Sequence, residues 1–183
     1  HIAWTYTAGS ITIKRELFLH WKQQAATLRY TVKGLSEKAT LRLSPMLTLR
    51  DFHSLSRQKD GASFKTVQNG DAMTVHRDDA MVSLQCRGAT FAPARPADQW
   101  WYDVHYQLDA QRGQDDLEDY FLPGAFEIEL DSDGEVLLTV ALGDQPAEAQ
   151  PSTDARAAHL APIAQQLGGD RSLAIASDDF IVD

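Results

Sequence analysis

Hydrophobic and polar residues alternate with a period of two along most of the first 142 positions of this chain. Such alternation is typical of β-strands with one buried face, and turns rich in Gly, Asn and Asp separate the alternating runs. About ten short strands at roughly 8 to 12 residue spacing predict an all-β fold, an antiparallel β-sandwich. The runs cover residues 1–6, 11–19, 26–32, 41–50, 64–68, 73–76, 81–86, 100–108, 126–130 and 135–142, with an extended connection over 89–97.

Two positions interrupt this pattern. Arg15 shares a face with the apolar residues of 11–19, so we expect either a buried partner for its charge or a shift of register there. Pro45 lies within 41–50 and has no backbone N–H to donate, which predicts a bulge or an edge strand.

The pattern changes after residue 142. The polar, proline-containing stretch 143–153 predicts a linker. It is followed by a predicted helix that Thr153 and Asp154 can cap and that Gly168 and Gly169 end, with a late start or a kink at Pro162. We therefore expect a sandwich domain over 1–142, then a linker and a short helical segment over 143–183. The helix is predicted from apolar residues at helical spacing: Leu160, Ile163, Ala164 and Leu167.

Residues 100–124 combine aromatic side chains, an Arg-Gly pair and an acidic run. At Arg112 and Gly113 the strand is predicted to give way to a short acidic helical turn, which Pro123 and Gly124 end. The stretch is therefore either an aromatic core strand followed by a loop or a surface that recognises a ligand. Alternation places Trp101, Asp103, His105 and Gln107 on one face of the strand and Trp100, Tyr102, Val104, Tyr106 and Leu108 on the other.

The ligand that suits this second interpretation is a sugar. Trp100 and Trp101 can stack on the C–H face of a sugar ring while Arg112, Glu118 and Asp119 bind its hydroxyl groups. Glu118 and Asp119 are not expected to be a glycosidase acid and base. Hydrolysis needs carboxyl groups that face each other roughly 5 to 9 Å apart, whereas side chains of adjacent residues diverge. We expect these two carboxylates to pair with Arg112 or to cap the next turn.

A second group of polar side chains follows the leucine-rich stretch 41–50. Arg50 offers a planar fork of donors, Asp51 is an acceptor, and His53 can act as either. Together they can hold a hydroxylated ligand. Alternatively, Arg50 and Asp51 pair with each other and brace the end of the strand.

Composition excludes several classes of partner. The formal net charge of −9 repels nucleic acid and anionic membranes. No apolar run approaches the roughly 18 residues of a membrane span. The chain lacks a phosphate-binding glycine loop, paired cysteines and clustered histidines, and the turn 131–134 lacks the ligands of a calcium loop, so we expect neither cofactor nor metal. The single cysteine, Cys86, is predicted to be a buried thiol, as suits a cytoplasmic protein.

Several motifs stand in one order along residues 10–142: Arg-Glu-Leu-Phe at 15–18, Thr-Leu-Arg-Leu-Ser-Pro at 40–45, Arg-Asp-Phe-His at 50–53, Tyr-x-x-Asp-x-x-Arg-Gly at 106–113, and Glu-Asp at 118–119 before Pro-Gly-x-Phe at 123–126. Jointly they resemble the N-terminal domain of bacterial and archaeal glycogen debranching enzymes of the amylo-α-1,6-glucosidase type. The final stretch, 174–182, resembles the segment that opens the catalytic domain of that family.

The resemblance implies a β-supersandwich similar to galactose mutarotase, followed by an (α/α)6 barrel that supplies the catalytic carboxylates. The chain would then be non-catalytic, supporting the barrel and contacting α-glucan (glycogen or maltooligosaccharide) through residues such as Arg50, His53, Trp100, Trp101 and Arg112. Asp109 stands where the family usually has Glu. Family members also have strands before the position of Trp4, and their absence suggests an open sheet edge and a strand-edge dimer.

Two other functions remain open. One is a free-standing module that binds carbohydrate or protein. The other is a mutarotase-like enzyme, for which His53 or His105 with Glu118 or Glu129 are the candidate pairs.

Overall fold

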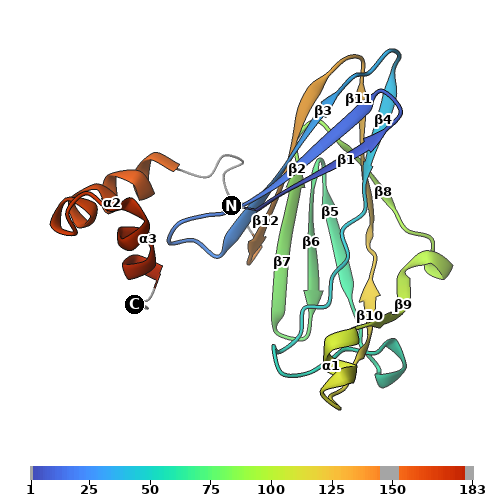
Figure 1. Ribbon diagram of the computed structural model, residues 1–183. Coiled ribbons are helices and arrows are strands. Elements are labelled where there is room, and N and C mark those ends of the chain that lie inside the picture. Colours follow the sequence, from blue (N-terminus) through green and yellow to red (C-terminus); the bar gives the residue numbers. More distant parts are fainter. Residues whose placement is uncertain (1, 145–152, 180–183) are drawn as a thin grey trace.

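The computed structural model describes residues 2–144 and 153–179, and its largest element is a seven-stranded antiparallel sheet (Figure 1). Its strand order is β1-β2-β3-β12-β7-β6-β5. The last strand, β12, returns from far along the chain to pair with both β3 and β7. The strands are β1 (Ile2–Ala8), β2 (Ile11–Leu19), β3 (Ala25–Lys33), β5 (Lys65–Asn69), β6 (Ala72–Arg77), β7 (Ala80–Cys86) and β12 (Gly134–Leu142).

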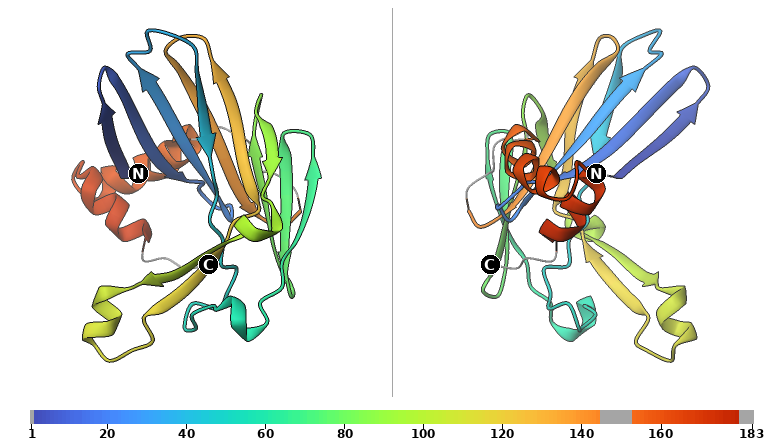
Figure 2. Two further views of the ribbon diagram at one scale, coloured as in Figure 1. Left: turned by 90° about the vertical axis from the view of Figure 1, so that its right-hand side faces the viewer. Right: turned by 60° about the vertical axis from the view of Figure 1, so that its left-hand side comes forward.

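A three-stranded sheet in the order β4-β11-β8 forms the second layer. A separate pair, β9 and β10, is connected through the short helix α1 and projects from the sandwich as an arm, residues 100–121 (Figure 2). The antiparallel β-sandwich predicted from the alternation is confirmed. The second layer consists of β4 (Ala39–Leu43), β8 (Thr90–Pro93) and β11 (Gly124–Leu130). The arm consists of β9 (Trp100–His105), α1 (Gln107–Gln111) and β10 (Leu117–Phe121).

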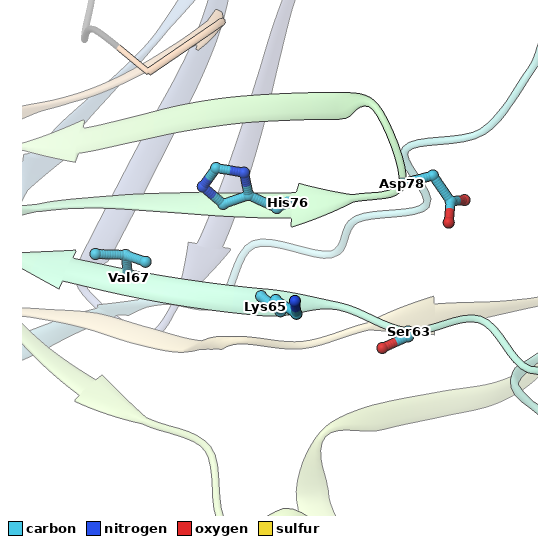
Figure 3. A pocket seen from close by; sticks show the side chains of 5 residues that line it. All are labelled: Ser63, Lys65, Val67, His76 and Asp78. Atoms are coloured by element: carbon cyan, nitrogen blue, oxygen red, sulfur yellow. The ribbon is translucent and has the colours of Figure 1, made fainter.

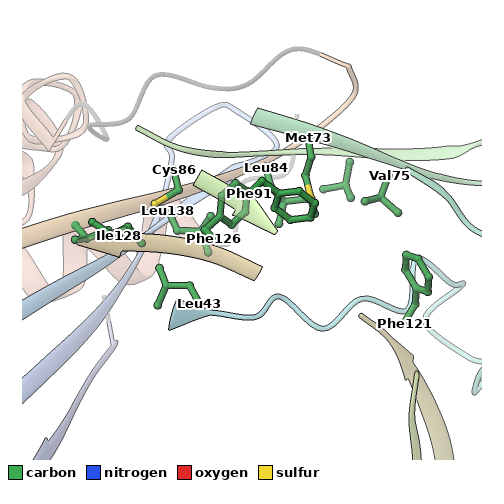
Figure 4. Packing of buried hydrophobic residues seen from close by; sticks show 12 residues of the cluster. Leu43, Met73, Val75, Leu84, Cys86, Phe91, Phe121, Phe126, Ile128 and Leu138 are labelled. Atoms are coloured by element: carbon green, nitrogen blue, oxygen red, sulfur yellow. The ribbon is translucent and has the colours of Figure 1, made fainter. Parts of the chain in front are cut away.

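The core lies between the two layers (Figure 4). Phe126 of β11 is fully buried, and its ring lies 5.1 Å from that of Phe91. Cys86 is fully buried, as predicted, and burial together with the charge of Asp71 raises the pKa of its thiol to about 11. The buried cluster consists of Leu43, Met73, Val75, Val82, Leu84, Cys86, Phe91, Phe121, Phe126, Ile128, Val136 and Leu138.

The β1 edge of the large sheet is much more exposed. Trp4 lies opposite Arg15, and Arg15 lies opposite Tyr30, so the register is continuous here. Of the two alternatives expected at Arg15, the register shift is therefore wrong. The Arg15 guanidinium instead lies over two aromatic rings, 4.4 Å from the centroid of Trp4 and 5.7 Å from that of Tyr6. Arginine is thus accommodated on this face by cation–π contacts.

Two predicted segments differ from the structure. The strand expected over 41–50 ends at Leu43, because Pro45 cannot continue the ladder; beyond it only Leu47 is paired, in an isolated bridge to Phe121. The connection expected over 89–97 contains β8, which pairs with β11 at the edge of the second layer.

The largest correction concerns the arm. The strand expected over 100–108 ends at His105, and the helical segment comes before Arg112 rather than after it. The acidic segment that was expected to be a helical turn is strand β10. Its carboxylates bind groups in a distant loop, and these tertiary contacts outweigh the local preference for a turn.

The predicted helix after the sandwich is confirmed as α2 (Thr153–Gln166), which contains Pro162 and is followed by α3 (Arg171–Asp179). Both helices lie beside the large sheet, away from the three-stranded layer (Figures 1 and 2). The ring of His159 lies 4.7 Å from that of Trp21. Residues 145–152 of the predicted linker, the capping side chains of Thr153 and Asp154, and residues 180–183 lie outside the described residues.

Within the described part of the chain, none of the helices has both the length and the apolar character needed to span a membrane.

Candidate functional site

The root of the arm brings together several of the residues predicted to bind a ligand. β9 and β10 pair in regular antiparallel register except for a shift between Glu118 and Tyr120. Asp103, on the opposite strand, has a left-handed backbone with a φ of 55°. Such an irregularity breaks strict alternation, and it allows two consecutive side chains, Glu118 and Asp119, to be almost fully buried.

Glu118 is completely buried and accepts four hydrogen bonds. Arg50 donates two of them, from Nε to Oε1 at 2.5 Å and from a terminal nitrogen to Oε2 at 3.1 Å. The Ser56 amide donates to Oε1 at 3.1 Å, and the Tyr106 hydroxyl donates to Oε2 at 2.6 Å. Burial by itself raises the pKa of Glu118, but these donors outweigh it, so the net pKa is lowered and the residue is a carboxylate.

The partners of Glu118 are themselves fixed. Arg50 also donates to the backbone carbonyl groups of Asp51 and Phe52, at 3.0 and 3.1 Å. The hydrogen bond to Glu118 raises the pKa of Arg50. Burial, followed by the hydrogen bond to Glu118, raises the pKa of the Tyr106 hydroxyl, which is therefore protonated at neutral pH.

Asp119 forms a second set of hydrogen bonds at the root of the arm. Its carboxylate accepts hydrogen bonds from the backbone amides of Gln58 at 2.9 Å and Asp103 at 3.0 Å. Arg57 adds a positive charge 3.4 Å away and also pairs with Asp103 at 2.5 Å. Burial raises the pKa of Asp119, but the two amides and Arg57 outweigh it, so the net pKa is lowered.

Sequence reasoning missed the true partners of the two carboxylates. Arg112, the expected partner, is exposed, and the cations at the arm root are Arg50 and Arg57. Arg50 does not pair with the carboxylate of Asp51, which instead accepts a hydrogen bond from the His53 amide at 2.8 Å. A separation of 68 residues between Arg50 and Glu118 explains the miss, because a local pattern carries no information about such a contact.

A further arginine completes the network. Arg77 donates to the Thr48 carbonyl at 2.5 Å and to the Ser56 hydroxyl at 2.7 Å, and its guanidinium lies 5.4 Å from the centroid of the Phe64 ring. The loop that follows β4 is thereby tied to β6 as well as to the arm.

The structure separates the eight predicted site residues into two groups. Arg50, Glu118 and Asp119 belong to the network, and Trp100 is partly buried against Phe64 and Phe121, with centroids 5.6 Å away in each case. The exposed group consists of Asp51, His53, Trp101 and Arg112, of which Trp101 is 55% exposed. Trp100 therefore fits the interpretation of a core strand, and ligand recognition by the exposed residues stays a prediction.

Two open grooves lie on the described surface, and neither is lined by the predicted residues. One, of about 460 Å³, follows β5 and β6 (Figure 3) and is lined by Ser63, Lys65, Val67, His76 and Asp78. The other, of about 470 Å³, lies where β4, β8 and β11 meet the arm and is lined by Arg42, Ser44, Pro93, Ala94, Arg95, Asp98, Leu122 and Gly124.

Comparison with solved structures finds distant likenesses, among them a glucoamylase and a polysaccharide lyase. A bacterial glucoamylase complexed with acarbose is 14% identical, with a TM-score of 0.42, over 92% of this chain and 24% of the glucoamylase. A polysaccharide lyase is 13% identical, with a TM-score of 0.39, over 78% of this chain and 21% of the lyase. The chain thus spans less than a quarter of either protein. No curated protein sequence matches it.

Comparison with protein families gives a broader match. The model of the glycogen debranching enzyme N-terminal family covers residues 1–137, about three quarters of the chain. That span contains the arm, the network at its root and all strands of both layers except residues 138–142 of β12. The chain therefore belongs to the glycogen debranching enzyme N-terminal family.

Proposed function

We propose that this chain is the non-catalytic supporting domain of a glycogen debranching enzyme that hydrolyses α-1,6 branch points of glycogen. Residues 1–142 form the supporting sandwich, and residues 143–183 form a linker, a helical segment and the beginning of an (α/α)6 catalytic domain. The sandwich buttresses that domain, and the exposed part of the arm contacts the α-glucan beside the active site.

The observation that carries this proposal is the state of Glu118 and Asp119. A glycosidase needs two opposed carboxyl groups whose pKa values differ, and the pKa of the one that acts as the acid is raised. Here the pKa values of both carboxyl groups are lowered, and hydrogen bonds from the protein occupy all four of their oxygens. The most distinctive acidic pair of the sequence thus fixes the arm and has no oxygen left to act on a substrate, which supports a non-catalytic domain.

The exposed side chains of the arm support glucan contact. Trp101 is 55% exposed and Tyr102 is 53% exposed, and such rings stack on the apolar face of a sugar. Arg112 of the arm and His53 of the loop after β4 are exposed and offer donors to hydroxyl groups. A net charge of −9 also suits a neutral polysaccharide better than an anionic ligand. Glu118 and Asp119, being buried, act through the position of the arm.

Isothermal titration with maltoheptaose tests the proposal. It is run on this chain alone and on this chain joined to the helical domain expected to follow residue 183. We expect Trp101→Ala to weaken binding about tenfold, the equivalent of 1.4 kcal/mol. Tyr6→Ala, which removes a similarly exposed aromatic ring from β1, is the matched control and should leave the affinity for maltoheptaose unchanged. Failure of both proteins to bind would contradict glucan contact.

A free-standing module that binds carbohydrate or protein is the second candidate, and the projecting arm with its two exposed rings favours it (Figure 2). The same titration separates the two functions. Full-strength binding by this chain alone, with no gain from the helical domain, supports the free-standing module.

The geometry gives less support to a mutarotase-like enzyme, because each candidate residue has another partner. His53 lies 3.3 Å from Asp51, and His105 lies 2.9 Å from Asp116. Glu129 accepts a hydrogen bond from Thr40 at 2.7 Å, and Glu118 is enclosed in the network. We expect the chain to leave the rate of glucose anomerisation unchanged.

A further inference from the structure

The groove of about 470 Å³ at the root of the arm has a rigid floor. Gly124 has a φ of 152°, and a Cβ atom there would lie 2.7 Å from the Phe91 ring and 2.9 Å from Pro93 Cα, so only glycine fits. Ala94 donates its amide to the Pro123 carbonyl at 3.0 Å. The backbone of β8 and that of β11 are therefore held in close contact beneath the groove.

The rim of the groove combines donors and acceptors without excess charge. Arg95 pairs with Asp98 at 2.7 Å, and Arg42 pairs with Glu127 at 3.4 Å. Each guanidinium has five N–H donors, and a single carboxylate leaves some of them available. Ser44 adds a hydroxyl group.

The balance of hydrogen-bond donors and acceptors on the rim favours a neutral ligand over an anionic one. An anionic ligand such as phosphate is bound best by arginines that have no competing carboxylate. A neutral ligand rich in hydroxyl groups uses donors and acceptors together, and the paired arginines and Asp98 offer both. The apolar lining from Pro93, Ala94 and Leu122 suits the C–H faces of sugar rings.

The position of the groove links it to the arm. Asp98, on its rim, comes two residues before β9, and Leu122 directly follows β10. The Leu122 amide donates to the Gln99 carbonyl at 2.8 Å, which closes the root of the arm beside the groove. Residues that line the groove therefore lie just before β9, the strand that carries Trp101, and just after β10.

We propose that this groove, lined by Arg42, Ser44, Arg95 and Asp98, is a second glucan subsite of the domain, distinct from the exposed rings of the arm. The inference rests on the proposed function for its ligand class, a neutral oligosaccharide. An α-glucan chain bound there meets the domain at two places, so the arm and the groove together fix its direction.

Two-dimensional ¹H–¹⁵N NMR of the full chain, titrated with maltoheptaose, tests this subsite. We expect saturable shifts of the Ser44, Ala94 and Gly124 amides. The double substitution Arg42→Ala and Arg95→Ala should weaken the response of these amides about tenfold while leaving the shifts near Trp101 in place. Both arginine side chains are largely exposed, 63% and 86%, so the variant should fold. Lys65→Ala, in the other groove, is the matched control.

The possible outcomes are distinguishable. Shifts near Trp101 without shifts at the groove overturn the subsite and leave the proposed function standing. Absence of shifts at both places in the wild type overturns the subsite, and the proposed glucan contact is contradicted as well only if the chain joined to the helical domain also fails to bind maltoheptaose. A stronger response of the groove amides to inorganic phosphate than to maltoheptaose overturns the neutral-sugar assignment.

Discussion

Two regions of the seven-stranded sheet share one sequence pattern and differ in what covers them: the neighbouring strands β6 and β7, here called the covered end, and the edge strand β1, the open end. The other edge strand, β5, is exposed along its length. At the covered end, Met73, Val75 and Leu84 of β6 and β7 are at most 1% exposed. At the open end, Ile2 and Tyr6 of β1 alternate in the same way and are 56% and 50% exposed. The core cluster joins the covered end to Leu43, Phe91, Phe126 and Ile128 of the three-stranded layer.

Alternation thus identifies the apolar face of a strand but does not indicate whether another layer covers that face. Apolar side chains stabilise a fold in proportion to the area that leaves water, about 25 cal/mol per Å². The same type of residue therefore contributes much at the covered end and little at β1. Arg15 fits this view, since a charge is tolerated over the rings of Trp4 and Tyr6.

Removing one aromatic ring from each region should give the largest difference in stability. Phe126→Ala empties a fully buried site, and we expect a loss of about 3 to 5 kcal/mol in the free energy of unfolding. Tyr6→Ala should cost no more than about 0.5 kcal/mol. Urea denaturation followed by tryptophan fluorescence measures both. Equal losses would show that β1 is covered in solution.

The network at the arm root extends the comparison to buried charge. Arg50→Met leaves the Glu118 carboxylate buried without its cation, and we expect a loss of about 3 kcal/mol. Adding Glu118→Gln removes the uncompensated charge and should recover most of the lost free energy of unfolding. A double variant as unstable as Arg50→Met would indicate that Arg50 acts through packing alone. Urea denaturation is again the measurement.

Acid should affect the arm root more than the open end. The pKa values of Glu118 and Asp119 are lowered in the folded state, so their stabilisation is complete above the unfolded values of about 4.3 and 3.9. It is lost as the pH falls through the lower, folded values. As the pH falls from about 5 to about 3, the urea concentration at the midpoint of unfolding should therefore decrease less for Glu118→Gln than for the wild type. Trp4→Ala should keep the wild-type slope, and a flattened slope in that variant would contradict the assignment.

The smallest expected effect concerns association at the open end. β1 is an edge strand with exposed apolar side chains, a surface that favours pairing with another strand. We expect weak strand-edge dimers in sedimentation velocity at the upper end of a micromolar to millimolar series. Tyr6→Lys should abolish them without lowering stability. A monomer throughout the series, for the wild type, would exclude this dimer.

Local patterns predicted most of the individual strands. The alternation over 11–19 and 26–32 and the helical spacing of Leu160, Ile163, Ala164 and Leu167 correspond to β2, β3 and α2. The prediction of the arm failed where tertiary contacts decide the conformation. A run of Asp and Glu favours a turn by itself, yet it forms β10 because Arg50, Arg57 and the Ser56 amide satisfy its buried carboxylates.

The two-residue periodicity, the all-β class and the ordered motifs that point to the family can all be read from residue type and spacing along the chain. The packing of the fold is needed to learn that Glu118 pairs with Arg50, that Trp100 is partly buried while Trp101 is exposed, and that β1 is uncovered. These outcomes depend on which distant segments meet. Many pairings of opposite charges and apolar faces are compatible with one sequence pattern, and the packing of the whole chain selects among them.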